Sequence, residues 1–275
     1  MSKKQTTHDG TILNIKKHLQ TLKLSTLERI IEDELDRALK EKRSLSETLE
    51  SLLSREAHAV IERRIENRIK ASRLPHRKLL ADFDFTFNKS IDKSQVMELA
   101  TLHFVERKQG LLLAGSSGTG KSHIAQALLL IGCLKLYRCR YTTASAMLND
   151  LMASLADETL HKKLKQYTKP DILLIDEIGF DRLEQETTRN ASLFFKVIEA
   201  RYCKNATLMT TNIDFQALGE YLGDPVITTA VVDRMVHHAI IMNFDGPSYR
   251  IHESKYLNKT HKQKEKPIAP LPADQ

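Results

Sequence analysis

The stretch LLLAGSSGTGKSHIA at residues 111–125 restricts the fold of this chain more than any other part of the sequence, because it changes from apolar to glycine-rich to helix-forming within fifteen positions. A short apolar run, then glycines, then HIAQALLLIG predicts a buried β-strand, a tight turn and a helix. Further short apolar runs at residues 139–142, 172–175, 207–210 and 239–242 are separated by helix-length segments. This alternation predicts an α/β fold with a parallel sheet between helices.

The glycine-rich turn predicts a binding site for a polyphosphate. Its sequence GSSGTGKS fits G-x-x-x-x-G-K-[ST] and lies between a predicted strand and a predicted helix. Glycines let consecutive backbone N–H groups point inward, and the helix N-terminus adds a partial positive charge. The residues expected to hold the nucleotide, ATP, are Gly115, Ser116, Ser117, Gly118, Thr119, Gly120, Lys121 and Ser122. We expect Lys121 to reach the β and γ phosphates and Ser122 to bind Mg²⁺. The alternative is a turn that only joins a strand to a helix.

Two carboxylates follow the apolar run in DILLIDEIGF, at residues 171–180. Asp176, at the carboxyl end of a predicted strand, suits Mg²⁺ coordination together with Ser122. Glu177 is expected to act as the general base that activates water, a group that a hydrolase needs and a small-molecule kinase does not. The alternative is an exposed acidic pair at a strand end. Asn212, which ends ATLMTTN, is placed to orient the attacking water, and is equally suited to cap the helix predicted in IDFQALGEYL.

The first eighty residues predict an all-helical block, since they contain one proline, Pro75, and one glycine, with apolar residues at helical spacing. Ser25 with Glu28, and Ser44 with Glu47, each fit a capping box. This block holds 18 Lys and Arg against 12 Asp and Glu, and the whole chain has a net charge of +7. Its cations would attract a polyanion. Residues 257–275 are basic and proline-rich, which predicts a disordered tail.

Membrane insertion, secretion and a zinc site are not indicated. The N-terminal basic residues have no apolar stretch behind them, and the longest charge-free apolar run, residues 122–134, is too short to span a bilayer. The three cysteines form no CxxC pair. We therefore expect a cytoplasmic protein.

The chain resembles the AAA+ ATPases of the IstB/DnaC type, and most closely the IstB-like helper ATPases of transposons. The motifs GSSGTGKSHIA, DILLIDEIGF, TLMTTN, VVDRMVHH and GPSYR occur in the order of that family, within about residues 45–252. The resemblance implies a P-loop AAA+ parallel sheet without a separate C-terminal lid domain, in which the TTN strand lies between the strands of the phosphate loop and of the Asp-Glu pair. It also implies that Asn212 senses the γ phosphate, that Arg234 is an arginine finger for a neighbouring subunit, and that Arg250 is the second sensor. From the residues alone, Arg234 is also compatible with a helix-surface arginine that pairs with a carboxylate.

The resemblance implies an ATP-dependent helper of transposition with duplex DNA, a transposase and further copies of the chain as its partners. It would have a helical basic DNA-binding and assembly domain at residues 1–80, an ATPase domain at 81–256 and the tail. The cations expected to grip DNA, largely without regard to sequence, are Arg63, Arg64, Arg68, Lys70, Arg73, Arg77 and Lys78. A solvated helix face is the alternative for these residues. A DnaC-like helicase loader and a small-molecule kinase are the rival functions. Phe83 and Phe85 would lie near the adenine or pack between the two blocks.

Overall fold

The computed structural model describes residues 3–179 and 187–254. The chain divides into two compact units, Met1–Asn67 and Arg68–Gln275. The predicted tail at residues 257–275 lies outside the described residues.

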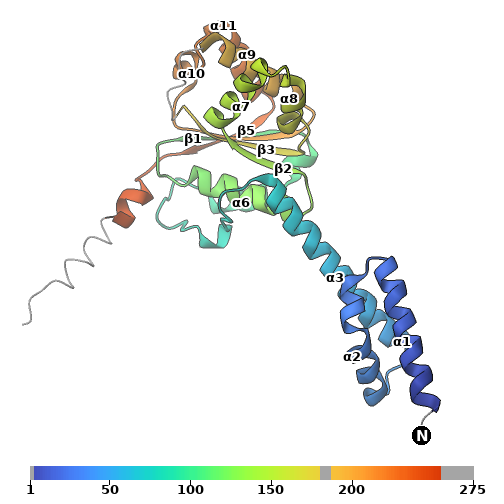
Figure 1. The fold of residues 1–275 in the computed structure, drawn as a ribbon. Helices are drawn as coiled ribbons and strands as arrows, with labels where there is room; N and C mark the ends of the chain where they lie inside the picture. Colours follow the sequence, from blue (N-terminus) through green and yellow to red (C-terminus); the bar gives the residue numbers. More distant parts are fainter. Residues whose placement is uncertain (1–2, 180–186, 255–275) are drawn as a thin grey trace, which may run out of the picture. The chain divides into compact units, whose positions relative to one another are not determined.

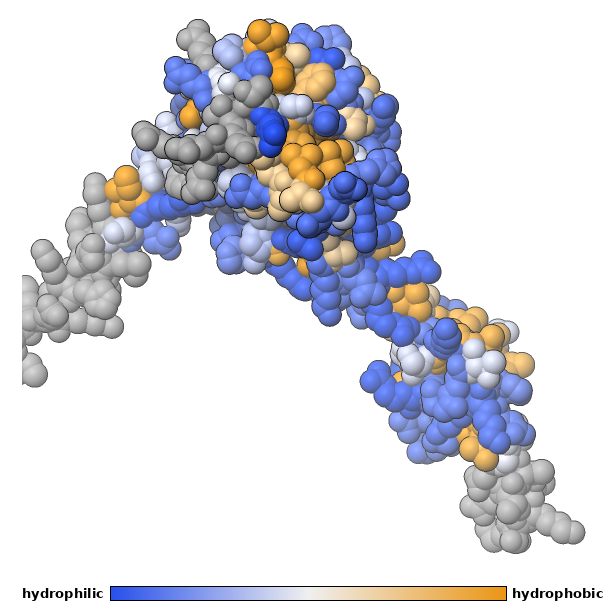
Figure 2. All heavy atoms as spheres, turned by 45° about the horizontal axis from the view of Figure 1, so that its top comes forward, coloured by the Kyte–Doolittle hydropathy of each residue, from blue (hydrophilic) through white to orange (hydrophobic). Residues whose placement is uncertain are grey.

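The first unit is helical, and its helices are α1 (Lys3–Thr21), α2 (Ser25–Glu41) and the first part of α3 (Leu45–Ser72). Its core contains Leu19, Leu27, Ile31 and Leu52. Hydrophobic side chains also appear on the visible surface of this unit (Figure 2). Among the exposed leucines of the unit, Leu39 and Leu45 are 70% and 85% exposed. The small core and these exposed leucines agree with the limited burial that three helices can achieve.

One of the two predicted capping boxes is confirmed, and the other is wrong. Before α3, the N–H of Ser44 donates to Glu47 Oε2 (2.7 Å) and the N–H of Glu47 donates to Ser44 Oγ (3.2 Å). Before α2, the N-cap residue is Leu24, which has no side-chain oxygen, and Glu28 accepts a hydrogen bond from Gln20 instead. The cap therefore lies one residue before the predicted position, so Ser25 is already helical. The α3 helix ends at Ser72, before Pro75, as predicted.

The second unit contains a five-stranded parallel sheet, and its strands are β1 (Gly110–Gly115), β2 (Cys139–Thr143), β3 (Ile172–Ile178), β4 (Ala206–Thr211) and β5 (Ala239–Phe244). All five predicted strands are confirmed. Their order is β2-β3-β4-β1-β5. The TTN strand, β4, thus lies between the strand of the phosphate loop and the strand of the acidic pair, as the family resemblance implies.

Helices cover both faces of this sheet (Figure 1). Before β1 come η1 (Leu80–Asp82), α4 (Lys93–Ala100) and α5 (His103–Glu106), and directly after it comes α6 (Lys121–Leu134). The later ones are α7 (Ala144–Ala156), α8 (Leu160–Thr168), α9 (Thr187–Arg201), α10 (Phe215–Leu222) and α11 (Pro225–His237). Helix α6 packs on one face, and α7 to α11 lie on the opposite side (Figure 1). The strands are apolar along most of their length because both faces are buried, and Leu112, Leu173 and Ile175 are fully inaccessible.

The carboxyl ends of the strands define the edge where the predicted site residues meet, because parallel strands all end on the same side. After β5 the described chain continues with residues 245–254, of which 249–254 are helical. Among the described residues, none of the helices combines the length and the apolar character needed to cross a membrane.

Candidate functional site

The phosphate loop connects the end of β1 to the start of α6, and its glycines adopt conformations that other residues avoid. Gly120 has φ +104°, and a Cβ at this position would lie 2.5 Å from the Phe83 ring. Gly115 has φ +137°, and a Cβ there would lie 2.2 Å from the carbonyl oxygen of Phe244. Both positions therefore require glycine for backbone conformation and for space.

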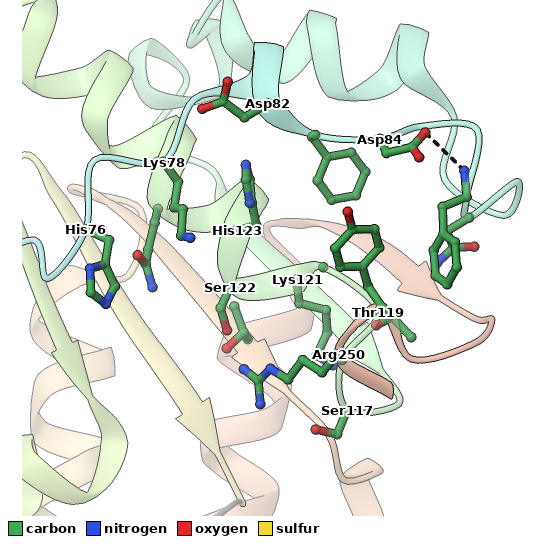
Figure 3. A pocket seen from close by; sticks show the side chains of 18 of the residues that line it. His76, Lys78, Asp82, Asp84, Ser117, Thr119, Lys121, Ser122, His123 and Arg250 are labelled. Carbon is green, nitrogen blue, oxygen red and sulfur yellow. Dashed lines mark hydrogen bonds between the residues drawn. The ribbon is translucent and has the colours of Figure 1, made fainter. Parts of the chain in front are cut away.

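Lys121 is buried at the first position of α6. Its Nζ donates to the carbonyl oxygens of Gly115 (2.7 Å) and Ser116 (2.6 Å) on the loop. Burial lowers the pKa of Lys121, Asp176 acts in the opposite direction, and the positive charge of Arg250 lowers it further. Arg250 extends across the loop beside Lys121 and Ser122 (Figure 3). The structure thus brings Arg250 to the loop, although the two lie far apart in the sequence.

Asp176 is almost completely buried and accepts hydrogen bonds from several side chains. Ser122 Oγ donates to its Oδ1 at 2.9 Å, and the hydroxyl of Thr210 donates to the same oxygen. Gln126 Nε2 (3.4 Å) and the Tyr141 hydroxyl (3.3 Å) donate to Oδ2. The contact between Ser122 and Asp176 joins the two residues that were predicted to bind Mg²⁺. Burial and the negative charge of Asp176 raise the pKa of Tyr141 above its usual value.

Glu177, the other member of the acidic pair, has an exposed side chain and a left-handed backbone, with φ +61°. The pairing of β3 with β4 shifts register here: Ile175 is opposite Met209 and Ile178 is opposite Thr211. Two residues of β3, Asp176 and Glu177, therefore face a single residue of β4, which is the arrangement of a β-bulge.

A cavity of about 710 Å³ opens beside the phosphate loop. It is lined by loop residues from Ser117 to Ser122, together with Glu177, Asn212 and Arg250. The structure therefore gathers most of the predicted nucleotide-site residues around one space (Figure 3). Asp214, whose side chain accepts from the N–H of Ala217 at 2.7 Å, caps α10. The alternative role of Asn212 as the cap of that helix is therefore wrong.

Aromatic residues line another part of this cavity. Phe83 and Phe87 come from the segment before β1, and Tyr249 from the segment after β5. Phe87 and Tyr249 are in edge contact, with ring centroids 5.1 Å apart. The N–H of Tyr249 donates to the carbonyl oxygen of Gly118 (2.9 Å), which fixes this segment on the loop. Phe85 packs against Phe83, at 4.8 Å between centroids, and is not among the residues that line the cavity.

Sequence reasoning did not identify Thr210, Gln126, Tyr141, Phe87 or Tyr249 as site residues. A signal was available for Thr210, which lies within TTN with Asn212, and for Tyr249, which lies within GPSYR with Arg250. The others reach the site through the pairing of β2 with β3 and through the packing of segments that are distant in the sequence.

Arg234 lies on α11 and does not line this cavity. Its Nε forms an ion pair with Glu199 of α9, and its Nη1 donates to the carbonyl oxygen of Ala230 (3.0 Å). The guanidinium lies over the ring of Phe195, 4.9 Å from its centroid. Within one chain, Arg234 is thus a helix-surface arginine paired with a carboxylate.

Of the seven cations predicted to bind DNA, four lie on helix α3, which crosses the boundary between the two units. Arg63 and Arg64 belong to the first unit, where Arg63 pairs with the buried Glu56 at 2.8 Å. Arg77 and Lys78 line the cavity beside the phosphate loop. The remaining three, Arg68, Lys70 and Arg73, lie at the start of the second unit.

A parallel sheet of this order, with a phosphate loop after β1 and an acidic pair on β3, defines a P-loop fold of the AAA+ class. Comparison with known proteins assigns the family more closely. The model of the IstB-like ATP-binding proteins matches residues 17–256, and the chain belongs to this family.

Its relatives include ATP-binding proteins of insertion sequences. That of IS5376 from Geobacillus stearothermophilus is 38% identical over 80% of this chain and 86% of the relative. That of IS21 from Pseudomonas aeruginosa is 36% identical over 86% of this chain and 88% of the relative. Among solved structures, the DnaC helicase loader (TM-score 0.51, 21% identity) covers 63% of this chain and 99% of its own. AMPPCP-bound DnaA from Aquifex aeolicus (TM-score 0.51, 19% identity) covers 69% of this chain and 57% of its own. These two structures show the same fold.

Proposed function

We propose that this protein is an ATPase that helps transposition: in its ATP form it oligomerises on target DNA, recruits and stimulates a transposase, and it disassembles on hydrolysis. The observation that carries the proposal is the cavity in which the phosphate loop, Glu177, Asn212 and Arg250 meet. Its relatives are ATP-binding proteins of insertion sequences, which supports a role in transposition.

The phosphate loop would bind the triphosphate of ATP, with residues Gly115 to Ser122 around it and Lys121 directed to the β and γ phosphates. The aromatic part of the cavity, formed by Phe83, Phe87 and Tyr249, is suited to the base. Ser122 Oγ and Asp176 Oδ1 are oxygen ligands 2.9 Å apart, a donor set that fits Mg²⁺. When bound, Mg²⁺ would neutralise charge on the phosphates.

Glu177 is proposed as the general base, because its exposed carboxylate lies at the cavity beside the buried Asp176. Asn212 would orient the attacking water. Arg250, which lies beside Lys121, would bind phosphate oxygens and so sense the nucleotide.

Arg234 is proposed to act on the nucleotide of a neighbouring subunit, because within its own chain it lies outside the cavity. A guanidinium supplied in trans stabilises the charge of the transferring phosphoryl group. Head-to-tail contacts of this kind build rings or helices. Hydrolysis would then depend on assembly, and loss of the γ phosphate would weaken the contact between subunits.

The direct test of the proposal is DNA binding by the full chain with ATP, with ADP and without nucleotide. We expect tight binding only with ATP, together with a rise in particle mass in sedimentation or light scattering. Equal affinity in all three states, or a monomer in the presence of ATP and DNA, would contradict the proposal. Pull-down with a transposase and with a replicative helicase separates this role from that of a helicase loader.

DNA binding is proposed for the basic residues of the 1–80 region, and we expect it to weaken when Arg64 and Lys70 are both changed to glutamine. Both side chains are exposed. For each cation that no longer neutralises a phosphate, the slope of log affinity against log salt concentration should become shallower by about 0.9. The slope of the double variant should therefore be shallower by about 2 in a salt titration. The matched control is Lys162→Gln with Lys204→Gln, two exposed lysines elsewhere. If both double variants change the slope equally, the location of the DNA contacts is wrong.

A further inference from the structure

Thr210 is a buried residue of β4 whose hydroxyl contacts both members of the acidic pair. It accepts a hydrogen bond from the backbone N–H of Glu177 (2.9 Å) and donates one to Asp176 Oδ1. A hydroxyl carries one proton and two lone pairs, so both bonds can exist together. The bond to Asp176 therefore uses the proton, and the bond from Glu177 uses a lone pair.

The hydroxyl of Thr210 takes the place of a backbone acceptor at the β-bulge. Between the pairs Ile175 with Met209 and Ile178 with Thr211, the regular ladder is interrupted. The N–H of Glu177 lies at this interruption and donates to the Thr210 side chain. The same N–H also donates to Asp176 Oδ1 (3.2 Å), so the Thr210 hydroxyl is the closer of the two acceptors that satisfy it at the bulge.

The bulge decides where the Glu177 carboxylate points. In a regular strand, successive side chains lie on opposite faces of the sheet, so only one carboxylate of an adjacent pair would reach the cavity side. Here Asp176 is buried against Ser122, while Glu177, with φ +61°, is exposed at the cavity. A left-handed conformation at a glutamate persists only where its surroundings hold it.

We infer that Thr210 is a positioning residue for hydrolysis. Its hydroxyl holds the Glu177 backbone in the bulge and fixes the Asp176 carboxylate. Both carboxylates can then act on the same bound nucleotide. This inference rests on the proposed role of Glu177 as the general base. Thr210 itself would not touch the reacting atoms.

The test is the replacement of Thr210 by valine, which keeps the shape and removes the hydroxyl. We expect kcat for ATP hydrolysis with duplex DNA to fall about 30-fold, or about 2 kcal/mol in the barrier. The KM for ATP should stay within about threefold, because the phosphate loop is unchanged. Thr210→Ser should restore kcat to within about threefold of the parent, and Thr210→Cys should give an intermediate value.

Two further variants separate positioning from a general loss of structure. Thr207→Val makes the same change on the same strand and removes a bond to Arg201 Nε (2.9 Å) away from the cavity. It should lower stability with little effect on kcat. In a Glu177→Gln background, Thr210→Val should lower kcat by a much smaller factor than in the parent, because one of the two carboxylates that it positions is already gone.

The outcomes distinguish this inference from the proposed function. If Thr210→Val and the parent hydrolyse ATP equally while Glu177→Gln is inactive, the inference is wrong and the general base stands. If Glu177→Gln hydrolyses ATP normally, the proposed role of Glu177 as the general base is contradicted, and this inference with it. If Thr210→Val does not fold, the kcat values of Thr210→Ser and Thr210→Cys are compared instead. A serine variant with a kcat as low as that of the cysteine variant would contradict the inference.

Discussion

Replacement of Glu177 by glutamine is expected to lower kcat for ATP hydrolysis by about 10² to 10⁴-fold, the usual contribution of a general base. The amide has nearly the same shape as the carboxylate but does not accept a proton from water. ATP binding should remain, since the phosphate loop, Ser122 and Asp176 are untouched. Because the γ phosphate would persist, the assembly should stay on DNA. Phosphate release, equilibrium ATP titration and the lifetime of the DNA complex measure these effects.

The control for this variant is Glu220→Gln, which changes an exposed glutamate on α10. It should hydrolyse ATP like the parent. Normal hydrolysis by Glu177→Gln would show that another group activates water. Loss of ATP binding in this variant would instead indicate that Glu177 is needed to form the cavity.

Replacement of Arg234 by alanine is expected to lower kcat by about 10³-fold or more, the range known for arginine fingers. ATP binding by the single chain should be almost unchanged, because Arg234 lies outside its own cavity. The decisive measurement mixes this variant with Glu177→Gln. In a mixed assembly, the intact base of one subunit meets the intact arginine of another, so that activity should reappear although each variant alone is inactive.

The alternative role for Arg234 is structural, because the residue forms an ion pair with Glu199 within its own chain. Glu199→Gln removes that pair and leaves the arginine in place. If Arg234 only supports the packing of α9 and α11, both variants should lose the same small amount of stability and keep their activity. If mixed assemblies of Arg234→Ala and Glu177→Gln remain inactive, the role in trans is refuted.

Local patterns were enough to predict the strands, the phosphate loop and the Ser44 cap, because each depends on residues that are close in the sequence. The position of β4 between β1 and β3 came from the family resemblance, and the sheet confirms it. The Ser25 cap was predicted wrongly, because the same pattern occurs one residue inside the helix, with Leu24 at the cap. Contacts over long sequence separations were not visible: Tyr141 and Thr210 reach Asp176 only once β2, β3 and β4 lie side by side.

The basic residues of RLPHRK, at 73–78, are a second case in which the sequence did not show which groups come together. The sequence shows a run of positive charge, and such a run predicts contact with a polyanion without saying which one. Arg77 and Lys78 line the cavity beside the phosphate loop, where the polyanion would be the nucleotide. Their contact with DNA stays a prediction. Their position at the cavity favours contact with the nucleotide.

The contact between Phe83 and Gly120 gives this protein a natural position for an optical probe. The ring lies directly on the last glycine of the loop, and the chain contains no tryptophan. An indole placed at residue 83 would be the sole tryptophan of the molecule, and its emission would come from the surface of the loop. The arrival and departure of a nucleotide would then be followed in real time, without labelling either the protein or the ligand.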